Sequence, residues 1–396
     1  MNKALNFYDV IIVGSGPSGA VAAGKLAEKG HSVLLLDKAT FPRDKICGDG
    51  LLESSIKILK KLELFEQISK EAFKAEEVLV FPFKNKSFKI KTLFYSLKRK
   101  RLDEILKKWA ENKGALSRQG KYLGEILEKD DNIEITVANG ENGKKERIKA
   151  RFLILASGCQ NMESISEQLN KKLAFERKIF ALRAYCKAEW NIQNPQIYFE
   201  NKFEIGYFWI FPMGNNIYNI GCGGIKNGLF LKNKLDHFLK TTKSLKGKNF
   251  TWLEKPKGAF INTNLSNLKH AAKGKVLLVG ELLGTTYPLN GEGVGKAMES
   301  ALIAAQTVHM ALIKNDNTII NSYPKELRKN IAPIYKAYSF AEKLLYHKRF
   351  GKLNFYLICS CKFLSNYISD VVSERKKPAD IKLFRFLYKL LNGFIK

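Results

Sequence analysis

The stretch that decides the fold runs from Tyr8 to Asp37 and reads YDVIIVGSGPSGAVAAGKLAEKGHSVLLLD. Its apolar run, Val10 to Val13, is typical of a strand that is buried on both faces. Gly14, Gly16 and Gly19 follow in the spacing G-x-G-x-x-G. The first glycine permits a tight turn, the second lets the backbone approach a pyrophosphate, and the third lets the next helix pack on the sheet.

The residues after the glycine turn complete a strand–turn–helix–strand unit. Ala20 to Lys29 is predicted to be a helix that ends at Gly30, and its N-terminus offers free N–H groups to a phosphate. Ser32 to Leu36 is the predicted second strand, and Asp37 follows it where an acid usually binds ribose hydroxyls. The unit therefore predicts a nucleotide site, and the alternative is a glycine turn that only packs.

Composition sets broad limits on the kind of protein. The chain has 396 residues, 45% of them hydrophobic, which indicates two or three globular domains rather than a disordered protein. The net charge of +29 suits nucleic acid, an anionic membrane or a phosphorylated substrate. The lysines do not cluster in one arm, and we expect no nucleic-acid partner.

Cysteine usage and the position of the first strand bear on the compartment. The six cysteines form neither a C-x-x-C pair nor a metal-ligand spacing. The nucleotide unit begins almost at Met1, which leaves no room for a signal peptide, and no apolar run is long enough to span a bilayer. We expect a reduced, cytoplasmic setting.

A loop with an unusual cysteine follows the nucleotide unit. It runs from Pro42 to Gly50 and places Cys47 before Gly-Asp-Gly, ahead of a predicted helix at 54–62. Most free cysteines are small buried residues. The functional interpretation is a loop laid against a cofactor, with the thiol near its reactive ring.

Two later strand-to-glycine turns repeat the nucleotide pattern. The buried strand 152–156 ends at Ser157 and Gly158, and the buried strand 275–280 leads into Glu281. Gly291, Gly293 and Val294 then precede a helix predicted at 296–312, whose N-terminus would stabilise an anionic ring.

An aromatic strand is the clearest feature of the middle of the chain. In the stretch 206–212, Tyr207, Trp209 and Phe211 share one face because side chains alternate along a strand. Phe208 and Ile210 share the other face. Ordinary sheet-core packing explains such a pattern, and the functional alternative is an aromatic wall for an apolar ligand.

The chain is predicted to be helical from about Pro324 to its end. Apolar residues recur at helical spacing with lysine and arginine elsewhere around the helix, which describes a basic amphipathic helix. The apolar positions are Ile381, Phe384, Leu387, Leu391 and Phe394. This helix either docks on the body with a solvated basic face or contacts a membrane.

Three motifs carry a resemblance to a known family. The loop 42–50 matches P-x-x-x-x-C-G-x-G, the strand 207–212 matches Y-x-W-x-F-P, and 288–294 matches P-x-x-G-E-G-I with valine in the last place. Together they resemble the geranylgeranyl reductase family of flavoproteins, over roughly 8–306. The layout resembles the p-hydroxybenzoate hydroxylase class.

The resemblance implies an α/β fold with a glutathione-reductase-like FAD-binding Rossmann domain, an inserted antiparallel β-sheet substrate domain and a C-terminal helical region. The FAD-binding domain is predicted at 1–75, 98–165 and 270–325. The substrate domain is predicted at 76–97 and 166–269, and the helical region at 326–396.

The resemblance also implies a function: FAD-dependent reduction of isolated C=C bonds in an isoprenoid chain, as a geranylgeranyl group of a lipid, a diphosphate or a prenylated quinone. The proton donor is Cys47, Tyr207 or a water, with Cys47 placed first because the motif puts it by the flavin. Tyr207, Trp209 and Phe211 are the predicted substrate wall. The predicted FAD contacts are Gly14, Gly16, Ser18, Gly19, Asp37, Cys47, Gly48, Gly50, Arg101, Leu123, Gly158, Glu281, Gly291, Gly293 and Val294.

Several points stay open at this level. Electrons come from NADPH or from a reduced ferredoxin, because no second dinucleotide fingerprint is present. The C-terminal helix allows peripheral contact with the inner membrane face. The competing functions are a flavin-dependent monooxygenase or halogenase, and a non-catalytic flavoprotein that binds lipid.

Overall fold

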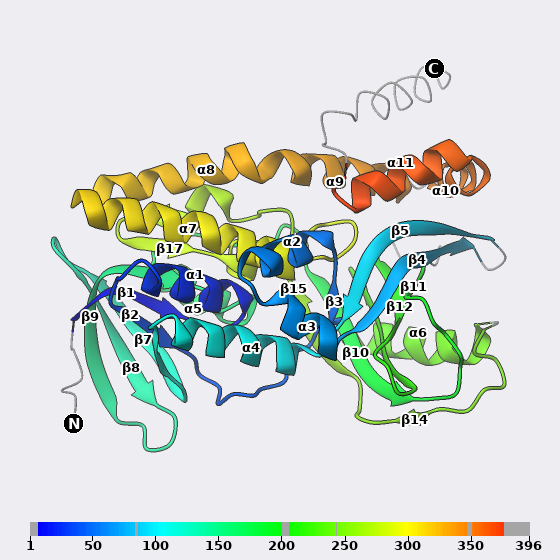
Figure 1. Cartoon of the computed structure of the whole chain (residues 1–396), viewed down its shortest axis with the longest axis horizontal. Coiled ribbons are helices and arrows are strands. Elements are labelled where there is room, and N and C mark those ends of the chain that lie inside the picture. Colours follow the sequence, from blue (N-terminus) through cyan, green and yellow to red (C-terminus); the bar gives the residue numbers. More distant parts are fainter. Residues whose placement is uncertain (1–6, 84–85, 200–205, 243, 347–350, 376–396) are drawn as a thin grey trace.

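Two β-sheets lie side by side beneath a layer of helices in the computed structural model (Figure 1). The structure describes residues 7–83, 86–199, 206–242, 244–346 and 351–375. The chain starts in one sheet, crosses twice to the other and finishes in the helical layer.

The first sheet is the one predicted from the glycine turn. Its main path runs β16-β17-β9-β1-β2-β6, and the pairs from β17 to β6 are parallel. Strand β9 begins well before the strand predicted at 152–156. Its first half pairs with β8, and its second half pairs with β1 and β17. The strands are β1 (Phe7–Val13), β2 (Val33–Leu36), β6 (Leu116–Arg118), β7 (Lys121–Glu128), β8 (Ile133–Asn139), β9 (Lys145–Leu155), β16 (Ala272–Lys273) and β17 (Val276–Leu278).

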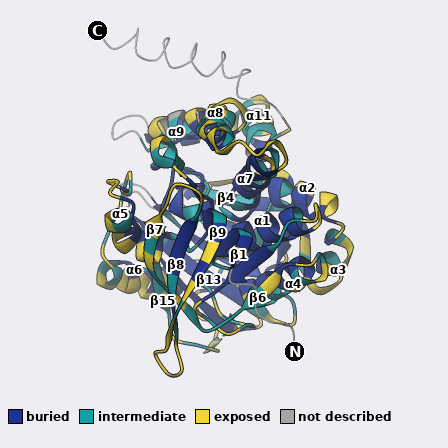
Figure 2. Cartoon of the chain, turned by 90° about the vertical axis from the view of Figure 1, so that its left-hand side faces the viewer, coloured by how far each residue is buried: buried dark blue, intermediate teal, exposed yellow. Residues whose placement is uncertain are grey.

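Three helices cover this sheet and bury its apolar strands. Helix α1 (Pro17–Ala27) packs between α4 (Arg99–Asn112) and α7 (Val294–Lys314). Figure 2 shows the mostly buried strand β1 next to α1, and β9 with buried and exposed stretches. The remaining short helices are α2 (Glu53–Lys61), α3 (Phe65–Glu71), α5 (Met162–Gln168), η1 (Cys159–Asn161), η2 (Leu268–His270), η3 (Gly280–Leu282) and η4 (Asn317–Ser322).

The second sheet has the order β14-β10-β13-β12-β11-β4-β5-β3, with β15 beside β10. It is antiparallel as expected except between β4 and β11, which run parallel. Helix α6 (Gly228–Thr241) covers its back. The strands are β3 (Gly50–Leu51), β4 (Phe73–Phe83), β5 (Lys86–Ser96), β10 (Ile179–Lys187), β11 (Gln196–Tyr198), β12 (Gly206–Pro212), β13 (Ile217–Gly224), β14 (Thr251–Trp252) and β15 (Lys257–Ile261).

The C-terminal part is helical as predicted. It comprises α8 (Tyr323–Asn330), α9 (Ala332–Leu345), α10 (Gly351–Ser360) and α11 (Lys362–Val372). Helices α10 and α11 lie against β5 of the second sheet (Figure 1). The amphipathic helix predicted at 381–396 lies outside the described residues. Within the described residues, no helix is both long and apolar enough to cross a bilayer.

The strands divide between the two sheets near the predicted domain boundaries. Strands β4 and β5, between 73 and 96, and β10 to β15, between 179 and 261, belong to the second sheet. The short strand β3, at residues predicted to be loop, joins this sheet as well. The boundaries themselves stay a prediction.

Candidate cofactor and substrate site

A single cavity of about 730 Å³ extends across both sheets. One end is formed by the glycine turns at the carboxyl edge of the first sheet, where parallel strands usually present a ligand site. The other end is formed by apolar side chains of the second sheet and of the C-terminal helices. Its apolar lining includes Val78, Val80, Phe88, Ile90, Ile197 and Phe199.

The glycine turn between β1 and α1 needs its glycines for two different reasons. Gly14 has φ +105°, and a Cβ there would lie 2.4 Å from the carbonyl oxygen of Ala156. Gly16 lines the cavity, and the nearest atom to a Cβ there would be a guanidinium nitrogen of Arg43 at 3.7 Å. The turn is thus closed towards the sheet and open towards the cavity, beside a cation and the N-terminus of α1.

Gly19, a predicted cofactor contact, does not line the cavity. A Cβ on this residue would lie 1.7 Å from the carbonyl oxygen of Gly14. The missing side chain therefore leaves room for the turn rather than for a ligand, and it lets α1 approach the strand.

Asp37 is fixed by the backbone at the end of β2. Its carboxylate accepts hydrogen bonds from the N–H of Ser15 at 2.6 Å and from that of Ala39 at 2.9 Å. The Arg43 guanidinium lies 4.0 Å away. The carboxylate lines the cavity in the place where an acid binds ribose hydroxyls.

Arg99, rather than the predicted Arg101, lines the cavity. Arg101 lies outside the cavity, and its guanidinium pairs with Glu71 and Glu104 at the surface. Helix α4 begins at Arg99, and successive residues turn by 100° around a helix. Arg99 therefore lines the cavity instead and makes a bidentate ion pair, at 2.7 and 2.9 Å, with the buried Asp103 one turn later.

The cysteine loop lies between the two ends of the cavity. Cys47 and Gly48 line it, and a Cβ on Gly48 would lie 3.2 Å from the ring of Phe211. Burial raises the pKa of the Cys47 thiol, and the opposing effect of the Arg99 guanidinium is smaller. The group therefore holds its proton at neutral pH, in the form that a proton donor needs.

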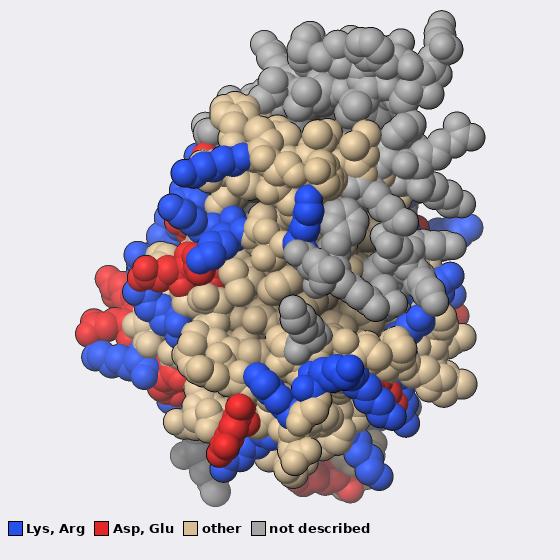
Figure 3. All heavy atoms as spheres, turned by 90° about the vertical axis from the view of Figure 1, so that its right-hand side faces the viewer, with Lys and Arg blue, Asp and Glu red and all other residues tan. Residues whose placement is uncertain are grey.

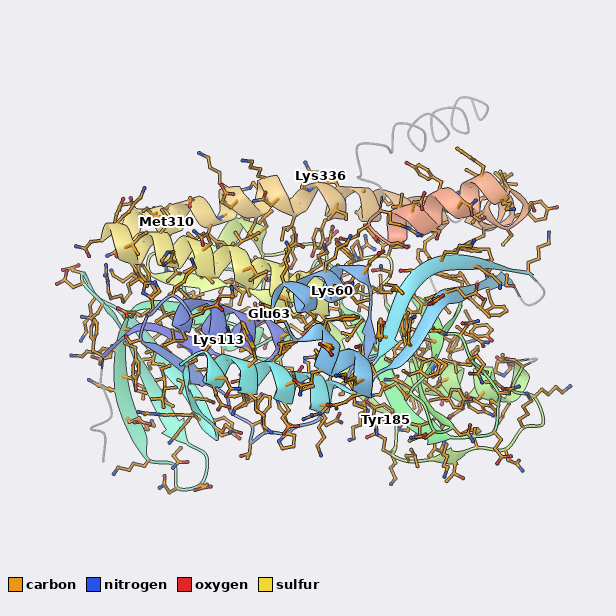
Figure 4. All side chains as sticks on the ribbon, in the orientation of Figure 1. Lys60, Glu63, Lys113, Tyr185, Met310 and Lys336 are labelled. Carbon is orange, nitrogen blue, oxygen red and sulfur yellow. The ribbon has the colours of Figure 1, made fainter. Side chains whose placement is uncertain are left out.

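Asp49 holds this loop in place through hydrogen bonds to its carboxylate. It has φ +62° and is almost completely buried. It accepts hydrogen bonds from the hydroxyl of Tyr185, which lies where the two sheets meet (Figure 4), and from the N–H of Arg99 at 3.2 Å. Burial raises the pKa of Asp49 to about 6, although its hydrogen bonds oppose the shift.

The aromatic strand has the two faces predicted from its alternation. Tyr207, Trp209 and Phe211 line the cavity, whereas Phe208 and Ile210 pack in the cluster that α6 covers. The Tyr207 hydroxyl donates to the carbonyl of Asn290 at 2.7 Å. Its proton is thus engaged by the protein.

Helices of the C-terminal layer complete the apolar end of the cavity. Leu345 ends α9, Phe355 and Ile358 lie on α10, and Ile368 lies on α11, and all of them line the cavity. The described C-terminal helices α9, α10 and α11 therefore form part of the wall of the apolar end.

The third glycine turn meets the cavity at the N-terminus of α7. Gly291, Gly293 and Val294 line it, and Val294 is the first residue of the helix. The side-chain nitrogen of Asn290 is buried there without a hydrogen-bond partner among the described residues. An unpaired donor and a helix N-terminus together fit an electron-rich ring with carbonyl acceptors.

The second glycine turn, at Gly158, completes the end of the cavity that the glycine turns form, which we call the cradle. Gly158 has φ +73° and lines the cavity beside Glu281, whose carboxylate lies 3.7 Å from the Lys45 ammonium. Glycine turns, a ribose-binding acid, cations and an unpaired donor thus lie along one cavity. These residues fit a dinucleotide with a flavin ring.

Sixteen predicted positions line this cavity and two do not. Those that do are Gly14, Gly16, Ser18, Asp37, Cys47, Gly48, Gly50, Leu123, Gly158, Tyr207, Trp209, Phe211, Glu281, Gly291, Gly293 and Val294. The sequence analysis missed Arg43, Asp49, Arg99 and Asn290. Asp49 and Asn290 stand inside the recognised motifs, and the spacing of Arg99 from Asp103, one helical turn, was the available signal for Arg99.

Comparison with known proteins agrees with this geometry. A family model described as an FAD binding domain matches residues 7–188. The chain is 26% identical over 319 residues to menaquinone reductase of Mycobacterium tuberculosis, covering 75% of this chain and 76% of that one. It is 27% identical over 355 residues to digeranylgeranylglycerophospholipid reductase 2 of Methanosphaera stadtmanae, covering 85% and 87%.

Solved structures show the same fold over nearly the whole chain. A geranylgeranyl bacteriochlorophyll reductase-like protein of Thermoplasma acidophilum matches with a TM-score of 0.81 and 20% identity, covering 96% of this chain and 99% of that one. A flavin-dependent brominase matches with a TM-score of 0.78 and 18% identity, covering 97% and 99%.

The fold, the cavity and the family match define the class: the protein is an FAD-dependent oxidoreductase. Within that class, the resemblance to the geranylgeranyl reductase family that its motifs predict is confirmed by these relatives. The predicted α/β fold around an FAD-binding sheet is confirmed as well.

Proposed function

We propose that the protein reduces isolated C=C bonds in an isoprenoid chain, carried by a lipid, a diphosphate or a prenylated quinone. The observation that carries the proposal is the continuity of the cavity, in which the flavin-type cradle opens directly into an apolar and aromatic chamber with the Cys47 loop between them. The sequence relatives support it, because one is named a menaquinone reductase and another a digeranylgeranylglycerophospholipid reductase.

Bound FAD, once reduced, supplies the hydride. We infer that the glycine turns, Asp37 and Arg43 hold its dinucleotide part, and that Asn290 with the N-terminus of α7 holds the ring. The cysteine loop and Glu281 line the same stretch of cavity. The glycine turns are placed by the backbone and Asp37 by buried hydrogen bonds, so these groups need little reorganisation on binding.

An isolated alkene accepts hydride only if the other carbon is protonated, because a free carbanion has nowhere to delocalise its charge. Cys47 is the proposed donor, because the residue lines the cavity and its raised pKa keeps the proton on sulfur. Tyr207 is a weaker candidate because its hydroxyl already donates to Asn290.

The aromatic wall has a role in the same step. Protonation ahead of hydride transfer develops positive charge on the substituted carbon, and aromatic faces stabilise cations by about 0.5–2 kcal/mol. Trp209 and Tyr207 line the chamber beside the cysteine loop. The apolar lining also keeps water from competing for the developing charge.

The electron donor is proposed to be NADPH or a reduced ferredoxin. The strongly positive net charge suits either an acidic protein or a phosphorylated cofactor. Stopped-flow reduction of the flavin by each donor decides between them.

Peripheral contact with an anionic membrane is proposed for the C-terminal helices. On α10, Leu353, Tyr356 and Leu357 are exposed at helical spacing, while Phe355 and Ile358 face the cavity. Figure 3 shows this end of the molecule, where many uncharged side chains lie towards the middle of the face and lysine and arginine, with some aspartate and glutamate, lie around them. Co-flotation with vesicles of anionic lipid tests the contact, and vesicles of zwitterionic lipid are the control.

The function is tested by reducing the flavin with dithionite without oxygen and then adding geranylgeranyl diphosphate, a geranylgeranylated lipid or menaquinone. We expect alkene-dependent reoxidation and a product heavier by two hydrogens. If the flavin stays reduced with every alkene but reoxidises in air through a long-lived oxygen adduct, a monooxygenase or halogenase takes the place of this proposal.

A further inference from the structure

Asn219 joins the cysteine loop to the aromatic wall. It lies on β13 and is completely buried. Its side-chain nitrogen donates to the carbonyl of Cys47 at 2.9 Å and to the carboxylate of Asp49 at 2.8 Å. Its side-chain oxygen accepts from the indole N–H of Trp209 at 2.8 Å. One amide therefore binds both sides of the chamber.

The indole of Trp209 has little other freedom. It lies across β13 at Gly221, where a Cβ would lie 2.2 Å from an indole carbon. The glycine lets the ring lie flat on the strand, and the bond to Asn219 fixes its rotation about that contact. The ring face that lines the chamber is thus set by two residues of the neighbouring strand.

The cysteine loop is held by hydrogen bonds to the carboxylate of Asp49 and to the carbonyl of Cys47. Asp49 receives hydrogen bonds from Tyr185 and from the N–H of Arg99, and Asn219 supplies a further one. The carbonyl of Cys47 is bound by Asn219 as well. Loss of this amide would leave a buried carbonyl and a buried carboxylate each short of a donor, which favours movement of the loop.

We propose that Asn219 is a positioning residue that fixes the Cys47 thiol relative to the face of Trp209, and so decides which carbons of a bound chain meet both groups. This inference rests on the proposed function, in which the thiol protonates one carbon and the aromatic face stabilises charge on its neighbour. The Cys47 thiol and the Trp209 face must contact adjacent carbons of the chain. Their position relative to each other would therefore determine which double bond is reduced.

The variants Asn219→Ala and Asn219→Leu separate the amide's hydrogen bonds from its bulk. Leucine keeps the approximate size, but it cannot donate to Cys47 or to Asp49 and cannot accept from Trp209. Asn267→Ala is the matched control, because Asn267 is also a buried asparagine bound to backbone, at 2.8 Å from the carbonyl of Leu282, and it lies outside the cavity.

The first readout needs no substrate. Alkylation of Cys47 by iodoacetamide in the flavin-bound protein, followed by peptide mass spectrometry, reports the freedom of the loop. We expect a rate roughly 10-fold faster in both Asn219 variants, because two hydrogen bonds to the loop are lost, and no change in Asn267→Ala. Unchanged alkylation in both Asn219 variants overturns the proposal, whatever their activity.

The second readout is turnover and product. We expect kcat to fall by about 10- to 100-fold with little change in KM, and the position of the reduced bond to spread over several isoprene units. An equal loss in Asn267→Ala, or an unchanged product pattern in the Asn219 variants, also overturns the proposal. If no variant nor the native protein reduces any alkene, the proposed function fails, while the alkylation rates still judge the positioning of Cys47.

Discussion

Replacing Gly221 by alanine tests how closely the aromatic wall is built. Gly221 pairs with Trp209 on β12 and with Arg183 on β10. A Cβ there would lie 2.2 Å from an indole carbon of Trp209 and 2.2 Å from the carbonyl oxygen of Leu182. Neither neighbour can withdraw easily, because the carbonyl belongs to a central strand and the indole is bound to Asn219.

The size of the effect follows from these contacts. Overpacking of a filled core costs about 1–3 kcal/mol. Displacement of the indole also breaks its hydrogen bond to Asn219, which adds about 1 kcal/mol. Replacing glycine by alanine restricts the unfolded chain and returns about 0.4–1 kcal/mol. We therefore expect Gly221→Ala to lower the free energy of unfolding by about 1–3 kcal/mol.

The same strand supplies the control. Gly223 is two residues further along β13, and the nearest atom to a Cβ there would be the Cβ of Ala181 at an ordinary 3.5 Å. Gly223→Ala should be neutral or stabilising, by up to about 1 kcal/mol. Both variants are compared with the native protein by urea denaturation followed by far-ultraviolet circular dichroism, and alkene reduction is measured in parallel.

Equal stability of the two alanine variants would refute the packing argument. If Gly221→Ala were less stable but reduced the alkene as fast as the native protein, the packing would stand and the catalytic importance of the Trp209 orientation would be refuted.

Three further predictions concern the cofactor end. Arg99→Ala should lower the free energy of unfolding by about 3 kcal/mol, because the buried Asp103 loses its bidentate partner and keeps the Arg43 guanidinium at 3.2 Å. It should also weaken FAD retention, because Arg99 lines the cavity. Arg101→Ala, at the surface, should change the free energy of unfolding by less than about 1 kcal/mol, and denaturation and flavin retention on a desalting column check both variants. Gly19→Ala should yield protein without FAD, seen as a missing flavin absorbance, because its Cβ would overlap the carbonyl of the glycine turn; a normal flavin content would contradict this. Burial raises the pKa of Asp49 from 3.8 to about 6, so between these pH values the native protein holds a proton that the unfolded chain has released, and this group destabilises the fold as the pH rises. The stability of the native protein relative to Asp49→Asn should therefore fall by about 2 kcal/mol between pH 4 and pH 7, and a difference independent of pH would refute the raised pKa.

Local sequence was enough to predict the parts of the site made by backbone. The turn at Gly14, the end of β2 at Asp37 and the cysteine loop are set by residues adjacent in the chain. Alternation alone was enough to assign Trp209 and Phe208 to opposite faces of β12, because the period of a strand is fixed by its geometry.

The parts that sequence could not predict depend on helix starts or on distant partners. Helix α4 begins after Lys98, which makes no side-chain cap, so no signal marked its start and the arginine was assigned to the wrong turn. Asn219 meets Cys47 across 172 positions of the chain, and the parallel pairing of β4 with β11 also joins segments that are far apart in sequence. Such contacts follow only from the folded arrangement.

The two ends of the cavity are built by different means, and this bears on how specificity arises. At the flavin end the decisive groups are backbone turns at Gly14, Gly158 and Gly291, where a side chain would strain or block the site. At the substrate end the wall consists of side chains, and its last section comes from Ile358 and Ile368 on the C-terminal helices. Side chains of the wall can change without disturbing the cradle, because the two sheets have largely separate cores. On the proposed function, we expect the length of chain that the chamber accepts to be set where α10 and α11 close it, and the bond that reacts to be set at Cys47 and Trp209.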